Sequence, residues 1–121
     1  MTPLMLAAAT AFNLTCTVTS GSTMGAPPKK LEHPEAWSFR VNLEEGRYCD
    51  GDCRATERIA KITSKTLYLR MIEGESLKET LQIDRESGDL LHVSEFAGKV
   101  VSNWTGTCKV SAFTGLPRRK Y

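Results

Sequence analysis

The sequence predicts an all-β domain, most simply a small antiparallel up-and-down barrel of about seven to eight strands stapled by disulfides. Two segments alternate apolar and polar side chains with the period of two that a half-buried strand requires. Short turn sequences separate most of the other apolar segments, and no segment sustains the i, i+3, i+4 pattern of a long helix. An open sheet or a β-sandwich would fit the same pattern.

The alternation is clearest in residues 12–19 and 37–43. From Phe12 to Val18 every second residue is apolar or cysteine, and threonines fill most of the positions between them. From Trp37 to Leu43 every second side chain is again apolar. Each segment therefore predicts a strand with one buried face and one wet face. Residues 20–34, which lie between them, are rich in glycine and proline and predict a long loop.

The rest of the chain predicts a meander of short hairpins. Segments 57–63 and 66–72 are expected to pair across Ser64-Lys65, and 78–85, 90–96 and 99–110 are expected to follow as strands. Turns are expected at 74–76, 86–89 and 97–99. In 66–72 the alternation places Leu67, Leu69 and Met71 on one face, and Tyr68 and Arg70 on the other. A meander that closes on itself would remove its own sheet edges.

Four cysteines suggest a covalent framework. Cys49 and Cys53 flank Asp50-Gly51-Asp52, a sequence that readily makes a tight turn, so their short separation makes them natural partners. That leaves Cys16 to pair with Cys108, which would tie the first strand to the last. Zinc and free thiols are the alternatives, but a structural zinc site usually repeats the close cysteine pair or adds spaced histidines.

Residues 1–11 are read as an export signal or an N-terminal extension, and residues 12–121 as a single β domain. The first segment is apolar, and Ala9-Thr10-Ala11 fits a small-x-small cleavage site, although no Lys or Arg precedes the apolar run. Disulfides and export together predict a periplasmic or secreted protein. The net charge of +2 is too small to predict nucleic-acid binding, and no apolar run is long enough to predict a transmembrane span. The oligomeric state is not predicted.

Two groups of residues are candidates for a binding role. Trp37, Phe39 and Trp104 are expected on the inner face of the sheet, where they could line a ligand cavity or simply fill the core. Asp50 and Asp52 lie in the cysteine-flanked turn and could form an interaction loop; as calcium ligands they lack the spread of an EF-hand loop. The sequence assigns no catalytic residue, no metal ligand and no cofactor.

Four stretches carry a resemblance to known proteins: Phe12-Asn13-Leu14-Thr15-Cys16, residues 37–53 with their cysteine pair, Ile83-Asp84-Arg85-Glu86-Ser87-Gly88, and Gly106-Thr107-Cys108. Together they resemble small exported bacterial envelope β-proteins of uncharacterised function. The pattern is also similar to periplasmic lysozyme inhibitors of the small-barrel type, which bridge their terminal strands by a disulfide. The resemblance implies an envelope β-protein. It transfers no active site, because the short serine-glycine loop of those inhibitors is absent here.

Three hypotheses of function follow. The first is a binding module that holds a small apolar or envelope-derived ligand. The second is a protein-interaction or enzyme-inhibitor module of the periplasm, acting through Asp50 and Asp52. The third is a hydrolase, which would require converging titratable groups in a concave site.

Overall fold

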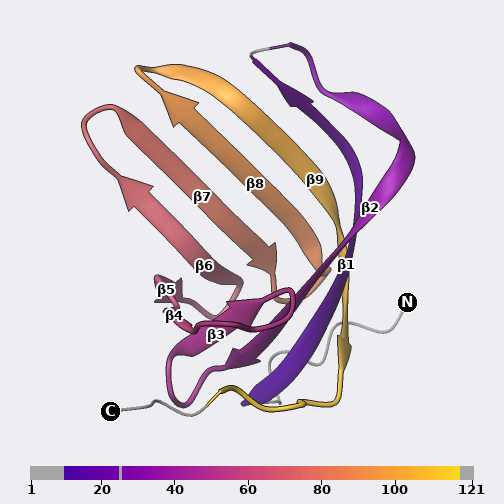
Figure 1. Ribbon diagram of the computed structural model, residues 1–121, viewed down its shortest axis with the longest axis vertical. Helices are drawn as coiled ribbons and strands as arrows, with labels where there is room; N and C mark the ends of the chain where they lie inside the picture. The colour runs from indigo at the N-terminus through magenta and orange to yellow at the C-terminus, as the bar shows by residue number, and fades with distance from the viewer. Residues whose placement is uncertain (1–9, 25, 118–121) are drawn as a thin grey trace.

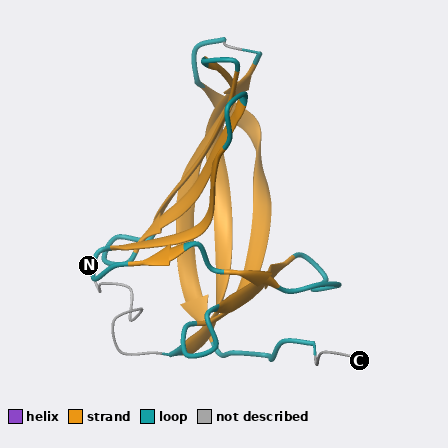
Figure 2. Ribbon diagram, turned by 90° about the vertical axis from the view of Figure 1, so that its left-hand side faces the viewer, coloured by secondary structure: helices purple, strands orange, loops and turns teal. Residues whose placement is uncertain are grey.

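The computed structural model describes residues 10–24 and 26–117. These residues form nine strands in one antiparallel sheet, and they contain no helix (Figure 1). The strands are β1 (Ala11–Thr23), β2 (Lys29–Asn42), β3 (Arg47–Asp50), β4 (Glu57–Arg58), β5 (Lys61–Ile62), β6 (Thr66–Glu73), β7 (Leu77–Asp84), β8 (Asp89–Phe96) and β9 (Lys99–Ser111). The order across the sheet is β4-β3-β2-β1-β9-β8-β7-β6-β5, and the sheet curls into a half-barrel (Figures 1 and 2).

The all-β prediction is confirmed, with more strands than expected. The segment 57–63, expected as one strand, is divided into β4 and β5 by Ile59 and Ala60. The amide of Ile59 donates to the carbonyl of Gly46 and the amide of Ala60 to that of Tyr68. The link therefore passes from the β3 side of the sheet to the β6 side. β3 lies where only a turn was expected, because Arg47–Asp50 pairs with Phe39–Asn42 of β2.

The long loop expected over residues 20–34 is wrong. β1 continues to Thr23 and β2 begins at Lys29, because both remain paired with each other at Ser20↔Lys30 and Gly21↔Lys29. The β1–β2 register shifts between Val18 and Ser20, so that residues 31–34 of β2, Pro34 among them, oppose only Thr19 of β1. A wide irregularity of this kind accommodates a proline that a regular ladder would exclude.

Both expected disulfides are present. Cys16 and Cys108 lie directly opposite each other on β1 and β9, with their Cα atoms 3.9 Å apart. Cys49 is bonded to Cys53 and closes a loop of four-residue separation. The first and last long strands are therefore hydrogen-bonded neighbours that are also joined covalently at the centre of the sheet.

The core fills one end of the half-barrel, where β3, β4 and β5 lie across the longer strands (Figure 1). We call this the closed end. Its buried cluster is contributed by alternating residues of strands from both halves of the sheet: Phe12, Leu14, Cys16, Val18, Phe39, Val41, Tyr48, Leu67, Leu69, Leu81, Ile83, Leu90 and Cys108.

At the opposite end, which we call the open end, the strands end in three connections near Thr23–Lys29, Glu73–Leu77 and Phe96–Lys99. Among the described residues, β3 pairs with β2 only over Phe39–Asn42, and β5 pairs with β6 only over Leu67 and Tyr68. The remaining lengths of β2 and β6 extend upward without a strand between them, so the barrel does not close there (Figure 1). In the described part of the chain no helix is long and apolar enough to cross a membrane.

Candidate ligand cavity

A cavity of about 500 Å³ lies on the concave face, between the closed and open ends. One wall comes from β2, β3 and the loop after β3; the other comes from β6, β7, β8 and β9. Its lining residues include Trp37, Phe39, Tyr48, Asp50, Arg70, Glu79, His92 and Trp104. The curl of the sheet brings the inward positions of these strands together (Figure 2).

The register places the aromatic residues on this face. Trp37 pairs with Cys16 and Phe39 with Leu14, and both partners are buried. Trp104 shares its face with Gly106 and Cys108 on β9 and lies opposite Gly21 of β1. A Cβ at Gly21 would collide with the Trp104 indole, so glycine is required where this ring crosses β1.

The three predicted lining residues, Trp37, Phe39 and Trp104, thus line one cavity. Phe39 is only 4% exposed and belongs to the core as well, whereas the two tryptophans are half-buried. The group therefore combines one core side chain with two partly exposed rings at the cavity. Whether these residues contact a ligand stays a prediction.

Arg70 lies in the cavity because β6 contains a β-bulge. Tyr68 pairs with Gln82 and Arg70 pairs with Leu81, so one extra residue, Leu69, is inserted between the two pairs. The bulge turns Arg70 to the inner face, which Leu81 shares, and leaves Met71 opposite Thr80. The expected alternation, with Met71 inward and Arg70 outward, is wrong beyond Leu69 for this reason.

Arg70 is the centre of an ion-pair network. Its guanidinium donates to both carboxylate oxygens of Glu57 on β4, at 2.8 and 3.0 Å, and to Glu79 on β7 at 3.4 Å. The hydrogen bonds to Glu57 raise the pKa of Arg70 above its usual range. The Arg70–Glu57 pair joins β6 to β4, the strand at the opposite edge of the sheet, at the closed end. Both side chains are more than a third exposed, so solvent screens this pair.

Glu79 is shared between Arg70 and His92. Its Oε2 atom lies 2.7 Å from Nε2 of His92 on β8, and both side chains are largely buried, at 14% and 21% exposed. The His92 ring meets Trp37 edge to face, with centroids 5.7 Å apart. Nδ1 of His92 is buried and has no hydrogen-bond partner among the described residues. Neither ring nitrogen is therefore free at the cavity surface, as a general base would need to be.

Tyr48 packs at the boundary between the core and this network. Its side chain is almost fully buried and lies against Phe39, with ring centroids 6.5 Å apart. Burial, and then the negative charge of Glu57, raise the pKa of Tyr48 to about 12. Tyr48 is therefore neutral over the physiological range and adds an apolar ring to the cavity wall.

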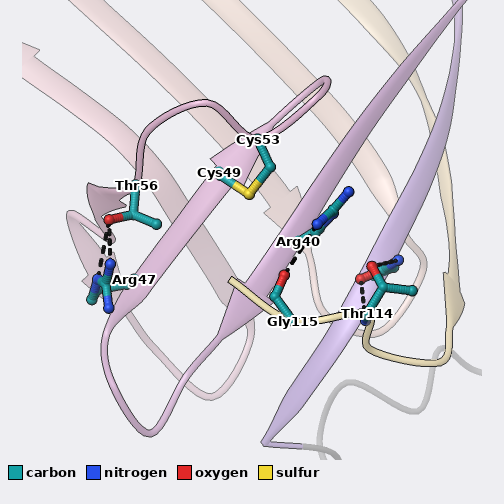
Figure 3. The surroundings of a disulfide bond; sticks show 8 residues. Arg40, Arg47, Cys49, Cys53, Thr56, Thr114 and Gly115 are labelled. Atoms are coloured by element: carbon teal, nitrogen blue, oxygen red, sulfur yellow. Dashed lines mark hydrogen bonds between the residues drawn. A yellow bond between two sulfur atoms is a disulfide. The ribbon is translucent and has the colours of Figure 1, made fainter. Parts of the chain in front are cut away.

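Asp50 and Asp52 lie on the rim of the cavity, in the loop that the Cys49–Cys53 disulfide closes. The Cys53 amide also donates to the Asp50 carbonyl, at 2.9 Å. Figure 3 shows this disulfide beside β3, with Thr56 bonded to Arg47 just beyond it. The loop is thus fixed at both sides, by the disulfide and by the Arg47–Thr56 contact.

The two aspartates differ in their surroundings. Asp50 pairs with Phe39 on β2 and so stands on the inner face, whereas the Asp52 carboxylate accepts a hydrogen bond from Arg54, at 3.0 Å. A role for either residue in binding stays a prediction. The loop closed by the Cys49–Cys53 disulfide therefore carries one carboxylate that is ion-paired, Asp52, and one on the inner face, Asp50.

The sequence analysis singled out Asp50 and Asp52 but missed three other polar residues of the cavity, Arg70, Glu79 and His92, although alternation along the strands gave a signal for two of them. Glu79 has the same parity as Leu81 and Ile83, and His92 the same as Leu90, so each could have been assigned to the inner face. Arg70 could not, because nothing in the sequence marks the bulge at Leu69.

Comparison with protein-family models, with curated proteins and with solved structures finds no match to this chain. The described residues contain no group of three or more His, Cys, Asp or Glu side chains arranged to hold a metal ion. What the site can do must therefore be argued from its geometry alone. It offers aromatic walls, the paired charges of Arg70 and Glu79, and Asp50 and Asp52 at its rim.

Proposed function

We propose that this protein is a binding module that holds a small, largely apolar molecule in the cavity on its concave face. The observation that carries the proposal is a single cavity walled by Trp37, Trp104 and Tyr48 from three different strands. Its volume of about 500 Å³ falls within the roughly 300–1,000 Å³ of ordinary ligand sites. Mostly apolar walls with a few placed polar groups are the usual composition of such sites.

The cavity is suited to binding because it is held open by the fold. The Cys16–Cys108 disulfide fixes the two central strands, and the Cys49–Cys53 disulfide fixes the rim. The charges of Arg70, Glu57 and Glu79 satisfy one another without a ligand. A site that needs no rearrangement on binding avoids much of the entropic cost of ordering.

We place this function outside the cytoplasm, in the periplasm or a secreted fraction. The support is the pair of disulfides, which persist mainly in oxidising compartments. The reading of residues 1–11 as an export signal belongs to this proposal; residues 1–9 lie outside the part of the chain that the structure describes. The likeness to envelope β-proteins is likewise part of the proposal.

Nile red, an uncharged dye that fluoresces in apolar surroundings, tests the function. The parent protein is expected to bind it, and Trp37→Leu to weaken binding about fivefold through lost apolar contact. Tyr68→Leu is the matched control, because Tyr68 lies on the other face of β6 beside Lys61. An absence of dye binding, or an equal loss in both variants, would contradict the proposal.

A second candidate is an interaction or inhibitor module that uses the pinned loop of Asp50 and Asp52. The observation that favours it is that both aspartates are exposed while the disulfide between Cys49 and Cys53 is buried. A rigid, protruding loop binds a partner with little ordering cost. Replacement of Asp50 and Asp52 together by alanine should then abolish capture of a partner from the protein's own envelope fraction. Unchanged capture would count against this candidate.

A further inference from the structure

We propose that the ligand of this cavity is a cationic amphiphile, a molecule with a positively charged head and an apolar chain. The inference rests on the proposed function and narrows it to one chemical class. Four features carry it: the engaged guanidinium and imidazole of the cavity, the position of an unpaired carboxylate, the aromatic walls, and an apolar strip on the concave face toward the open end.

The guanidinium of Arg70 and the Nε2 atom of His92 are already engaged in the cavity. Arg70 holds Glu57 through two hydrogen bonds and Glu79 through a third. His92 is bonded to Glu79 through Nε2. An anionic ligand would have to displace these carboxylates from Arg70, and it would lose about as much charge pairing as it gained.

The negative groups are in excess. Among the described residues, three carboxylates line the cavity, those of Asp50, Asp52 and Glu79, against the single guanidinium of Arg70. Asp52 has Arg54 as its partner, but the structure records no hydrogen bond or ion pair for the Asp50 side chain. A cation at Asp50 would therefore gain a charge partner without breaking an existing pair.

The aromatic walls also favour a cation. Trp37 and Trp104 line the cavity that Asp50 borders, and the face of an indole ring attracts positive charge more strongly than other aromatic faces do. Organic ammonium groups are commonly held by such rings together with a carboxylate. The same residues give no comparable attraction to an anion.

An apolar strip continues above the charged floor. Ile72, Leu77 and Phe96 are 40%, 41% and 56% exposed. Ile72 pairs with Glu79, and Leu77 pairs with Phe96, so the three lie on the concave face with the cavity. Leu77 precedes Glu79 by two residues, about 7 Å along the strand. A head held at Asp50 would place its apolar chain along this strip. A metal ion or a small amine has no apolar chain and would not use the strip.

Three amphiphiles with the same chain and different heads test the inference: dodecyltrimethylammonium, dodecyl maltoside and dodecanoate. Each is titrated below its critical micelle concentration into the full chain by calorimetry. We expect the ammonium compound to bind at least about tenfold more tightly than the other two, and to be the one of the three whose affinity falls with added salt.

Asp50→Asn should weaken binding of the ammonium compound about fivefold and leave binding of the maltoside unchanged. Asp89→Asn is the matched control, because Asp89 is an exposed carboxylate of β8 that does not line this cavity and carries the same charge change. Phe96→Ser should weaken the ammonium compound by shortening the apolar strip, without altering the charge.

The failures of the two proposals are distinguishable. Equal affinity for all three heads, tighter binding of dodecanoate, or an equal effect of Asp50→Asn and Asp89→Asn would overturn the inference while the cavity remained a binding site. The same holds if no amphiphile binds but Nile red does. Loss of Nile red binding as well would overturn the proposed function itself.

Discussion

The closed and open ends of the half-barrel are built from the same strands and have opposite character. On β7, Ile83 at the closed end is fully buried, while Leu77 at the open end, on the same face, is 41% exposed. On β2, Val41 is fully buried at the closed end, and Glu35 is exposed on the same face toward the open end. The closed end therefore supplies the burial that stabilises the fold, and the open end leaves inward positions available for a ligand.

The two disulfides show the same division, and their removal has the largest effect we expect on stability. Replacing Cys16 and Cys108 by alanine frees a loop of 92-residue separation and should lower the free energy of unfolding by about 4–5 kcal/mol. Replacing Cys49 and Cys53 frees a loop of four-residue separation and should cost about 2 kcal/mol. Urea unfolding of both variants measures the difference.

Binding should follow the reverse order. The small disulfide holds the rim around Asp50, so its loss should weaken Nile red binding more than loss of the large disulfide does, at temperatures where both variants are folded. If the variant that lacks the Cys49–Cys53 bond bound the dye as the parent does, the rim would have no part in the site. The expected division, in which the large disulfide mainly serves stability and the small one mainly serves binding, would then be wrong.

A pair of substitutions on one strand sharpens the comparison of the two ends. Ile83→Ala should lower the free energy of unfolding by about 3 kcal/mol, because it opens a cavity among fully buried side chains. Leu77→Ala, on the same face of β7, should cost less than about 1 kcal/mol, because Leu77 is 41% exposed and loses far less buried contact than Ile83. Equal losses in urea unfolding would mean that the open end is packed as tightly as the closed end.

The closed end was also the part that the sequence predicted best. Strict alternation in residues 12–19 and 37–43 identified the inner faces of β1 and β2, and the cysteines identified the neighbours β1 and β9. These patterns can be recognised in the sequence because burial of one face imposes alternating apolar and polar side chains on both strands of a pair.

The candidate site was predicted only in part, because it depends on departures from that period. Beyond the bulge at Leu69, the residues of β6 that face inward are the opposite of those expected, so Arg70 lies on the inner face. A bulge has no reliable signal in a single sequence. β3 has only four residues, and its strand character comes from pairing with β2 rather than from its own composition. Tertiary pairing decided both elements, so local pattern could not reveal them.

Tyr48 lies at the boundary of the two ends. Its ionisation gives the smallest effect on the free energy of unfolding that we expect. Its pKa of about 12 in the folded protein lies above the ordinary tyrosine value of about 10. Between these two pH values the unfolded chain loses the phenolic proton while the folded protein keeps it, so stability falls as pH rises. From about pH 9 to about pH 11 the parent should lose on the order of 1 kcal/mol more than Tyr48→Phe, which has no proton to lose.

Urea unfolding of the parent and of Tyr48→Phe, at matched pH values, measures this difference. The two proteins should have nearly the same stability below about pH 9, because the phenol is neutral there in both states. The burial that raises the pKa belongs to the closed end, and the charge of Glu57 that adds to it belongs to the network on the cavity floor. Parallel pH profiles would show that the phenol is solvated in the folded protein. The buried core of the closed end would then not include the Tyr48 hydroxyl.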